Sequence, residues 1–513
     1  GDHRVLHSFP TRRSSDLDYI LAIDVGTQSI RAILIDPSGT LHDIVKTPIE
    51  PYYSEQPGWA EQDPDYYWKT LCQTCKKLIA STKIRKESIR GVTMTTQRDT
   101  MVNVDRNGRP LRPAIVWLDQ RRASKGNWPN PVLKAALRAM KLLEAVEYTI
   151  TESESNWIRE NQPEIWEKTH KFLFLSGFLT HRLVGEYVDS TGCTVGFVPF
   201  DYKTQAWAKP SDMKWKMFPM DPSVLPALVK PSEMMGYITK KASSETGIPA
   251  GLPLIAAAAD KACEVLGSGC MSPEIACLSY GTTATVETTN TKYVEIVPFI
   301  PPYPSAVPGA YNTEVMIYRG FWMVSWFKRE FGMREELIAK KRKISPERLF
   351  DELVADIPPG SMGLMLQPYW SPGLKIPGPE AKGAVIGFGD VHTRAHIYRS
   401  ILEGLAYALK EGAIRTEKRN GVKIERIRVS GGGSQSDVPM QLTADIFDMP
   451  TERPHTYETS ALGAAIDAAV GLRIHPDFPS AVKEMTSIGK VFEPVPTNRD
   501  IYRDLLEKVY LKL

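Results

Sequence analysis

Short apolar runs bounded by turn residues recur along the chain and predict buried β-strands. The first run is Tyr19–Ile23, which ends at Asp24; a polar bend, Gly26–Ser29, separates it from a second run, Ala32–Ile35. Runs of this length that are rich in β-branched residues are typical of strands. The pattern therefore predicts a β-hairpin whose bend carries a carboxylate, a glycine and polar side chains.

The same hairpin pattern occurs again in the second half of the chain. The apolar run Ile275–Ser279 leads into a bend, Tyr280–Thr283, and a further run, Ala284–Val286. Two copies of one unit predict two domains of related design, and duplicated layouts of this kind place ligands at the interface between the domains.

The rest of the pattern alternates strands with helices and predicts an α/β fold. Strands are expected at Leu41–Ile49, Ile89–Thr95, Met101–Val104, Ala114–Trp117, Gly251–Ile255 and Ile424–Val429. Helices are expected around Tyr66, Trp68 and Leu71, over most of Ser155–Leu183, and at Lys261–Leu266, Arg394–Leu409, Pro439–Phe447 and Ser460–Val470, with proline-rich loops at 298–309 and 372–383.

Domain boundaries follow from the repeat. We expect an N-terminal domain over 18–267, a C-terminal domain over 268–490 and a C-terminal helix over 491–513, with the change near the glycine-rich segment 267–269. Residues 1–17 have neither the apolar core nor the cleavage site of a targeting peptide and resemble a translated sequencing adapter, so we expect a non-native extension.

Composition narrows the function classes. The chain has 513 residues, of which 42% are hydrophobic and 24% charged, and a net charge of only +3. So small a net charge does not indicate nucleic-acid binding. No apolar segment approaches the ~18 residues of a membrane span. Six cysteines in so long a chain form no disulfide scaffold, so we expect a reducing cytoplasm. The lone pair Cys72 and Cys75 is better explained by chance than by zinc, since no second ligand pair lies nearby.

The first bend has the chemistry of a phosphate site. Successive backbone N–H groups at such a bend form an anion-binding concavity, and Asp24 can hold a hydrated Mg²⁺ beside it. A Walker phosphate loop would instead open a helix and end in Gly-Lys-Ser/Thr, which is not found here. Taken alone, the segment is equally compatible with an ordinary hairpin.

Ten collinear motifs resemble the FGGY carbohydrate kinases, a family of the actin-like, ribonuclease-H-like ATPase superfamily. In chain order they read DVGTQSIRA, PGWAEQDP, TTQRDT, IVWLDQR, NWIRENQPEIW, DKACEVLGSG, SYGTTA, GAVIGFGDVHTRAHIYRSILEGLAYAL, SGGGSQSD and ETSALGAA. The match extends from about Asp18 to about Leu472. The resemblance implies two ribonuclease-H-like domains with a catalytic cleft between them, and ATP-dependent phosphorylation of a sugar or polyol hydroxyl.

The resemblance also implies residue roles. Asp260 would take the hydroxyl proton and lie near the metal, and Asp24 would help to hold Mg²⁺. As an alternative, a carboxylate at the start of a helix serves only as its N-terminal cap. ATP would be contacted from three loops, by Gly26, Thr27, Gln28, Ser29 and Arg31, by Gly281, Thr282 and Thr283, and by Gly431, Gly432, Gly433, Ser434 and Ser436. The substrate would be contacted by Gln97, Arg98, Asp99, Trp117 and Asp260.

Some alternatives stay open at this point. Arg98 and Asp99 could pair with each other on the surface, which is the usual fate of adjacent charges. Asp119 and Arg121 are better explained by a structural role. Lys261 could steer an acidic substrate or face solvent.

Departures from the glycerol kinase pattern put glycerol itself in doubt. They are Gln28 in the phosphate bend, Thr96 and Asp99 in the substrate loop, and Ala259 and Lys261 on either side of Asp260. The acceptor class therefore stays a polyol, a ketose or a sugar acid, and dimers are common in the family.

Two other functions remain to be weighed. A non-catalytic or chaperone-like ATPase on the same fold would not need the motifs TTQRDT and IVWLDQR. A nicotinamide dehydrogenase would use the loop at Gly431–Gly433, but the third glycine of the dinucleotide fingerprint is replaced there by Ser436.

Overall fold

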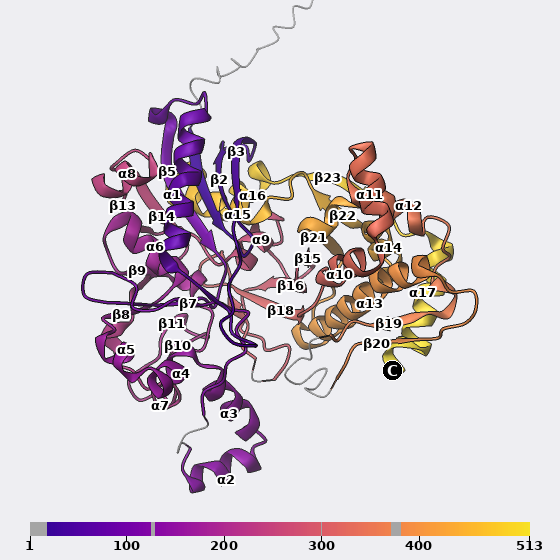
Figure 1. Cartoon of the computed structure of the whole chain (residues 1–513), viewed down its shortest axis with the longest axis horizontal. Coiled ribbons are helices and arrows are strands. Elements are labelled where there is room, and N and C mark those ends of the chain that lie inside the picture. The colour runs from indigo at the N-terminus through magenta and orange to yellow at the C-terminus, as the bar shows by residue number, and fades with distance from the viewer. Residues whose placement is uncertain (1–17, 125–128, 299, 371–380) are drawn as a thin grey trace, which may run out of the picture.

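The computed structural model describes residues 18–124, 129–298, 300–370 and 381–513, so the expected leader and most of the 372–383 loop lie outside the described residues. Two α/β halves stand side by side, the indigo-to-magenta half carrying β1 and the orange-to-yellow half carrying α13 (Figure 1). The α/β class expected from the repeated hairpin is confirmed. Among the described helices, none is long and apolar enough to cross a membrane.

The first half is built on a six-stranded sheet in the order β13-β14-β5-β1-β2-β3. Its strands are β1 (Tyr19–Val25), β2 (Ser29–Ile35), β3 (Leu41–Pro48), β5 (Ile89–Thr96), β13 (Met234–Tyr237) and β14 (Pro253–Ala256). The helices around it are α1 (Pro64–Ser81), α6 (Leu175–Val184), α8 (Lys240–Thr246), α9 (Asp260–Gly267), α15 (Thr459–Gly471) and α16 (Phe478–Met485).

The second half repeats this order around a seven-stranded sheet, β17-β18-β16-β15-β21-β22-β23. Its strands are β15 (Ile275–Tyr280), β16 (Ala284–Asn290), β17 (Tyr303–Pro304), β18 (Tyr311–Ile317), β21 (Arg426–Ser430), β22 (Thr451–Pro454) and β23 (Ile488–Phe492). In each sheet three antiparallel strands, β3-β2-β1 or β18-β16-β15, continue into two parallel ones, β5-β14 or β21-β22. The two halves are therefore copies of one topology.

Strand β1 is buried on both faces because helices cover both sides of its sheet. Leu21 and Ile23 pack in the cluster that contains α1, whereas Ile20 and Ala22 pack against the alanines of α15. Strands covered on both sides read as continuous apolar runs, which is why this segment was visible in the sequence.

Helix α15 crosses from one half to the other. It follows β22 of the second sheet, yet it packs on α9, β1 and β5 of the first, and its yellow ribbon lies among indigo strands in Figure 1. Small residues allow this approach: a Cβ at Gly463 would lie 1.9 Å from the carbonyl oxygen of Cys263. The boundaries 18–267 and 268–490 remain predictions, because this helix joins the two halves.

The segment Ser155–Leu183 is largely helical, as its spacing predicted, but a short strand interrupts it. It contains α4 (Glu154–Asn161), α5 (Pro163–Lys168), the strand β8 (Lys171–Phe174) and then α6. Strand β8 pairs antiparallel with β6 (Met101–Val104), and this pairing with residues far away in sequence overrides the local helical spacing.

The other elements complete both halves. In the first half they are β4 (Glu61–Gln62), β7 (Ala114–Ile115), α2 (Pro131–Ala139), α3 (Leu143–Glu152), β9 (Val188–Ser190), β10 (Phe200–Asp201), β11 (Ala206–Trp207), α7 (Lys214–Met217), β12 (Ala227–Val229) and the 3₁₀ turns η2 (Lys86–Ser88), η3 (Thr191–Cys193) and η4 (Pro222–Val224). In the second they are α10 (Trp322–Phe331), α11 (Met333–Arg342), α12 (Pro346–Val354), β19 (Met365–Gln367), β20 (Ala384–Ile386), α13 (Arg394–Asn420), α14 (Asp437–Phe447), α17 (Pro496–Lys508), η5 (Ser361–Gly363), η6 (Gly432–Gln435) and η7 (Tyr510–Lys512).

Candidate active site

The end of β1 carries a buried ion pair. Asp24 is 3% exposed and stands directly opposite Arg31 in the β1–β2 register. The Nη1 atom of Arg31 lies 2.5 Å from Oδ2 of Asp24, and its Nε lies 3.2 Å from Oε2 of Glu458. Burial raises the pKa of Asp24 above its ordinary value, although Arg31 counteracts the shift. Arg31, expected beside phosphate, is thus held between two carboxylates.

The bend after Asp24 leaves its backbone accessible. The amide of Gly26 donates to the carbonyl of Ser29 at 3.1 Å, which closes the turn. Gly26 does not adopt a positive φ, and a Cβ there would meet its nearest neighbour at 3.5 Å, an ordinary contact. The Gln28 side chain is exposed, so this departure from the glycerol kinase pattern costs nothing in packing.

A chain of hydrogen bonds links this bend to the substrate loop. The indole Nε1 of Trp117 donates to Oγ1 of Thr27 at 3.1 Å, and that hydroxyl donates to Oε1 of Gln97 at 3.0 Å. The Nε2 of Gln97 donates in turn to the hydroxyl of Tyr67 at 2.9 Å. Three residues predicted for ATP or substrate therefore form one rigid connection between the two loops.

Asp260 lies at the first turn of α9 and is positioned through the two residues that precede it. The amide of Ala259 donates to the carbonyl of Gly192 at 3.0 Å, and Oγ1 of Thr95 donates to the carbonyl of Ala258 at 2.8 Å. Burial raises the pKa of Asp260 to about 6, with Asp24 adding to the shift and the cations Lys261 and Arg98 opposing it. The carboxylate therefore titrates near the pH at which a general base works best.

Arg98 reaches across the cleft instead of pairing with Asp99. Its Nη2 lies 2.8 Å from both carboxylate oxygens of Glu314 in β18, and its guanidinium lies 4.8 Å from the ring centre of Tyr303. The surface pairing considered from the sequence is wrong, since both Arg98 and Asp99 are largely buried. Asp99 has a φ of 55°, and burial raises its pKa to about 7.

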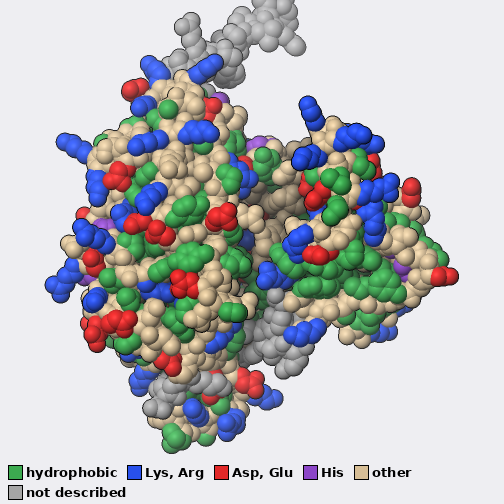
Figure 2. All heavy atoms as spheres, in the orientation of Figure 1, with side chains coloured by type: hydrophobic (Ala, Val, Ile, Leu, Met, Phe, Trp, Pro, Cys, Tyr) green, Lys and Arg blue, Asp and Glu red, His purple; other side chains and the backbone are tan. Residues whose placement is uncertain are grey.

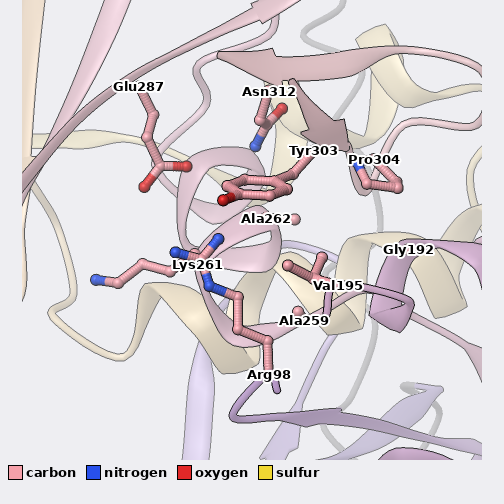
Figure 3. A pocket seen from close by; sticks show the side chains of 10 residues that line it. All are labelled: Arg98, Gly192, Val195, Ala259, Lys261, Ala262, Glu287, Tyr303, Pro304 and Asn312. Atoms are coloured by element: carbon pink, nitrogen blue, oxygen red, sulfur yellow. The ribbon is translucent and has the colours of Figure 1, made fainter. Parts of the chain in front are cut away.

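A small cavity of about 10 Å³, room for about one water molecule, lies between the halves next to α9. Figure 3 shows the side chains that line it, with Arg98 reaching toward the ring of Tyr303. Space-filling atoms also show a hollow between the halves (Figure 2). The lining residues come from both halves: Arg98, Gly192, Val195, Ala259, Lys261, Ala262, Glu287, Tyr303, Pro304 and Asn312.

Several residues of this region were not found from the sequence. Glu287 and Glu314 stand opposite each other on β16 and β18, and Glu152 adds to the raised pKa of Asp99. The available signal was a glutamate within each strand segment, where a charged residue that becomes buried needs a partner. The partner, Arg98, lies far away in sequence and only the fold brings it there.

The Lys261 side chain is 17% exposed and is held by neighbouring groups, so it is not free to steer a ligand. Its Nζ lies 2.8 Å from Oε2 of Glu264 and 2.5 Å from Oγ of Ser279. Burial lowers the pKa of Lys261, but the neighbouring carboxylates of Glu264 and Asp260 raise this pKa above its ordinary value. The residue therefore joins α9 to β15.

The second bend is held by backbone and aromatic contacts. The amides of Phe321 and Trp322 donate to the carbonyls of Gly281 and Thr282 at 3.0 and 3.3 Å, while Thr283 at its end is buried. The ring of Tyr280 stacks on that of Phe321 at 4.4 Å between centres. A Cβ at Gly281 would meet its nearest neighbour at 3.4 Å, so this bend too leaves room beside its glycine.

The loop Gly431–Gly433 packs against the second bend. Gly431 has a φ of +81°, and a Cβ there would lie 2.9 Å from the carbonyl carbon of Tyr280; at Gly433 a Cβ would lie 2.4 Å from the Phe321 ring. Gly432 is exposed, with open space where a Cβ would point. A 3₁₀ turn, η6, separates the loop from α14, unlike the direct entry into a helix of a dinucleotide fingerprint.

The two serines of this loop are engaged within the protein. Oγ of Ser434 donates to the carbonyl of Gly431 at 2.8 Å, and Oγ of Ser436 donates to Oδ1 of Asp351 at 2.6 Å. Their predicted contact with ATP would therefore use their backbone, next to the exposed Gly432.

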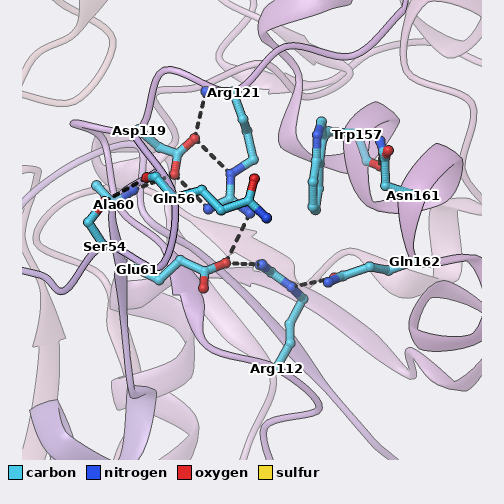
Figure 4. A network of polar contacts seen from close by, with 10 residues as sticks. All are labelled: Ser54, Gln56, Ala60, Glu61, Arg112, Asp119, Arg121, Trp157, Asn161 and Gln162. Atoms are coloured by element: carbon cyan, nitrogen blue, oxygen red, sulfur yellow. Dashed lines mark hydrogen bonds and ion pairs between the residues drawn. The ribbon is translucent and has the colours of Figure 1, made fainter. Parts of the chain in front are cut away.

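Asp119 and Arg121 belong to a buried network away from the cleft carboxylates, in keeping with the structural role expected of them (Figure 4). The Nε of Arg121 donates to Oδ1 of Asp119 at 2.8 Å, and its Nη1 lies 2.9 Å from Oε1 of Glu61. Oδ2 of Asp119 accepts from the amide of Ala60 at 2.6 Å. The network fixes the segments PGWAEQDP and IVWLDQR to each other.

A magnesium site would rest on Asp24 and Asp260. Within the described ranges no group of three or more His, Cys, Asp or Glu could hold a metal by itself, and Cys72 and Cys75 are buried and free. The two carboxylates are close enough for the charge of Asp24 to raise the pKa of Asp260. A carboxylate can accept several bonds, and Mg²⁺ ordinarily completes its shell with water and substrate phosphates. The residues present therefore fit this ion.

A repeated sheet of this order, with carboxylates at the end of the first hairpin and between the halves, is the architecture of the actin-like ATPase fold. Residues 19–267 match the N-terminal domain and residues 276–472 the C-terminal domain of the FGGY family of carbohydrate kinases, so the chain belongs to this family. It is a carbohydrate kinase, a phosphotransferase with an alcohol group as acceptor.

Individual relatives agree over nearly the whole chain. It is 31% identical to an uncharacterized sugar kinase of Escherichia coli K12, with 96% of this chain and 92% of that one covered. It is 29% identical to a xylulose kinase of Staphylococcus epidermidis, with 94% of each covered. The crystal structure of a gluconate kinase from Lactobacillus acidophilus superposes with a TM-score of 0.80 over 97% of each chain at 21% identity, which shows the common fold.

Proposed function

We propose that the enzyme transfers the γ-phosphate of ATP to a hydroxyl of a small polyol, ketose or sugar acid, with Asp260 as the general base. The observation that carries the proposal is the position of Asp260 at the start of α9. There burial holds its pKa at about 6, and it interacts with Asp24 of the first hairpin and Arg98 of the substrate loop. A carboxylate that only capped a helix would not need surroundings that disfavour its negative charge, as burial does at Asp260.

The reaction balances with the groups present. The acceptor hydroxyl oxygen forms a bond to the γ-phosphorus and gives its proton to a carboxylate oxygen of Asp260. The bond from that phosphorus to the bridging oxygen breaks, and ADP leaves with the electron pair. Closure of the two halves around Asp260 would keep water from competing for the phosphoryl group.

ATP would be held between the two bends. The backbone at Gly26 and Thr27 would approach the phosphates from the first half, and that at Gly281 and Thr282 from the second. Asp24 and Asp260 would hold Mg²⁺, which when bound neutralises phosphate charge. Arg31 would hold Asp24 in place, since it already donates to that carboxylate. The exposed Gly432 would leave room for adenosine.

Two expectations about context stay predictions. All six cysteines are free and buried, which is compatible with the cytoplasmic location proposed from their number. The homodimer suggested by the family resemblance would be tested by light scattering at the assay concentration.

An ATP-coupled assay over glycerol, tetritols, pentitols, pentuloses, hexuloses and aldonic acids tests the function. At least one acceptor should stimulate ADP release, and Asp260→Asn should abolish the stimulation while the protein stays folded. ADP release that no acceptor changes would contradict the proposal, and so would near-normal turnover by Asp260→Asn.

A further inference from the structure

The cations that line the cavity between the halves already face carboxylates. Nη2 of Arg98 lies 2.8 Å from both Oε1 and Oε2 of Glu314. Nζ of Lys261 lies 2.8 Å from Oε2 of Glu264. Both ion pairs are largely shielded from water, so neither is weakened by solvent as a surface pair would be. A negative ligand would therefore have to compete with a carboxylate for each cation.

The other ionisable groups near Arg98 are carboxyl groups. Glu287 stands opposite Glu314 in the β16–β18 register, and Asp99 and Asp260 approach from the first half. Burial, with Glu314 opposite, raises the pKa of Glu287 well above its ordinary value, so these surroundings disfavour negative charge and would disfavour a carboxylate on a ligand as well.

Two buried polar atoms, one on the neighbour of Arg98 in the chain and one in the cavity lining, lack a partner among the described residues. Oδ1 of Asp99 is a buried acceptor and Nδ2 of Asn312 is a buried donor, and neither has a hydrogen bond among the described residues. Asn312 is 1% exposed and lines the cavity. A hydroxyl group both donates and accepts, so a hydroxylated ligand can satisfy both kinds of atom, whereas an ionised carboxylate only accepts.

We infer that the acceptor is an uncharged polyol or ketose, and that Glu314 excludes sugar acids by occupying Arg98. This inference rests on the proposed kinase function and narrows its substrate class. Glu314 acts from the second half of the molecule on a residue of the substrate loop, so it would set specificity without carrying out chemistry.

The first test compares acceptors of equal length on the wild-type enzyme. A pentitol, a pentulose and a pentonate of matching configuration are assayed for ADP release at saturating ATP. We expect kcat/KM for the better neutral acceptor to exceed that for the pentonate by about 100-fold or more. A preference for the pentonate would overturn the inference while leaving the kinase proposal intact; phosphorylation of no carbohydrate at all would instead contradict the kinase proposal.

The second test frees Arg98. In Glu314→Gln the guanidinium loses its counter-charge, so the ratio of kcat/KM for pentonate to that for the neutral acceptor should rise by about tenfold. Glu335→Gln is the matched control, because it breaks an ion pair with Arg394 between α11 and α13, outside the cavity lining, and should leave the ratio unchanged. An unchanged ratio in folded Glu314→Gln would overturn the role of Glu314. Should that variant fail to fold, Glu314→Asp, which keeps the charge, must preserve the wild-type preference.

Discussion

The bend after β1 and the bend after β15 occupy equivalent places in two copies of one topology, but different forces hold them. The first is organised by charge: Asp24 pairs with Arg31, and Arg31 with Glu458. The second is organised by backbone hydrogen bonds to the start of α10 and by the stacked rings of Tyr280 and Phe321. The duplicated backbone thus supports two different tasks.

This difference bears on the proposed roles of the two bends. A buried carboxylate is costly unless it is paired, so the Asp24–Arg31 ion pair is explained if, as proposed, Asp24 helps to hold a metal beside the transferred phosphate. An aromatic stack gives a stable platform without charge, which suits a surface that only has to present backbone donors. Both bends keep open space beside their glycine, at Gly26 and Gly281.

The largest expected effect concerns the charged side of the cleft. Asp260→Asn removes the base while keeping its shape, so kcat/KM for the best acceptor should fall by about 10³-fold or more. The protein should remain as stable as the wild type, because burial already disfavours the ionised carboxylate of Asp260. Steady-state kinetics and a thermal unfolding scan check both expectations.

The matched control for that variant is Asp105→Asn. Asp105 lies in an exposed turn, where its side chain accepts from the amides of Asn107 and Arg109. Its activity should stay near that of the wild type. Equal activity in both variants would mean that Asp260 is not the general base.

The next effect tests whether Arg31 positions Asp24 or contacts phosphate. In Arg31→Met, two buried carboxylates lose their partner, so the free energy of unfolding should fall by about 3 kcal/mol and kcat by about 100-fold. Arg90→Met, which removes an exposed pair with Asp18, should change neither quantity measurably. Denaturant unfolding and kinetics provide the measurements. A rise in the KM for ATP with normal stability would instead support the phosphate contact.

A smaller effect compares the glycines of the two bends. Gly26→Ala and Gly281→Ala have space for a methyl group, so both proteins should fold normally, but the KM for ATP should rise by about tenfold because the backbone can no longer approach phosphate closely. Gly431→Ala should fail differently, by losing stability, because its positive φ and the nearby Tyr280 backbone leave no room. If Gly26→Ala and Gly281→Ala left the KM for ATP unchanged, the open space beside these two glycines would not be used to bind ATP.

The sequence was sufficient for the fold and for the residues that end strands. Both hairpins read as apolar runs because their sheets are covered on both faces, and Asp24 and Asp260 stood out as carboxylates where such runs stop. Local spacing failed at β8, whose strand conformation depends on pairing with β6. Local sequence also could not predict the role of Glu314, because its ion-pair partner Arg98 is 216 positions away in the chain.

Where side chains were assigned from neighbours in sequence, the fold changed their partners. Lys261 was expected to face either ligand or solvent, but α9 turns it toward Glu264 and Ser279. Arg31 was expected at phosphate, but the crossing of α15 brings Glu458 to it. Contacts that depend on two distant segments could not be predicted from either one.

The smallest effect is a pH dependence that belongs to Asp260. The base must be ionised to accept a proton, and its pKa lies at about 6 in the free enzyme, so kcat/KM for the acceptor should fall as the pH drops through that value. At pH 5.5 the loss of kcat/KM should be about fourfold relative to pH 7.5. The residual rate of Asp260→Asn should lack this inflection, because an amide does not titrate. An inflection of the same size in that variant would assign the titration to another group, such as Asp99 with its pKa of about 7, and would move the acid–base chemistry from the catalytic helix to the substrate loop.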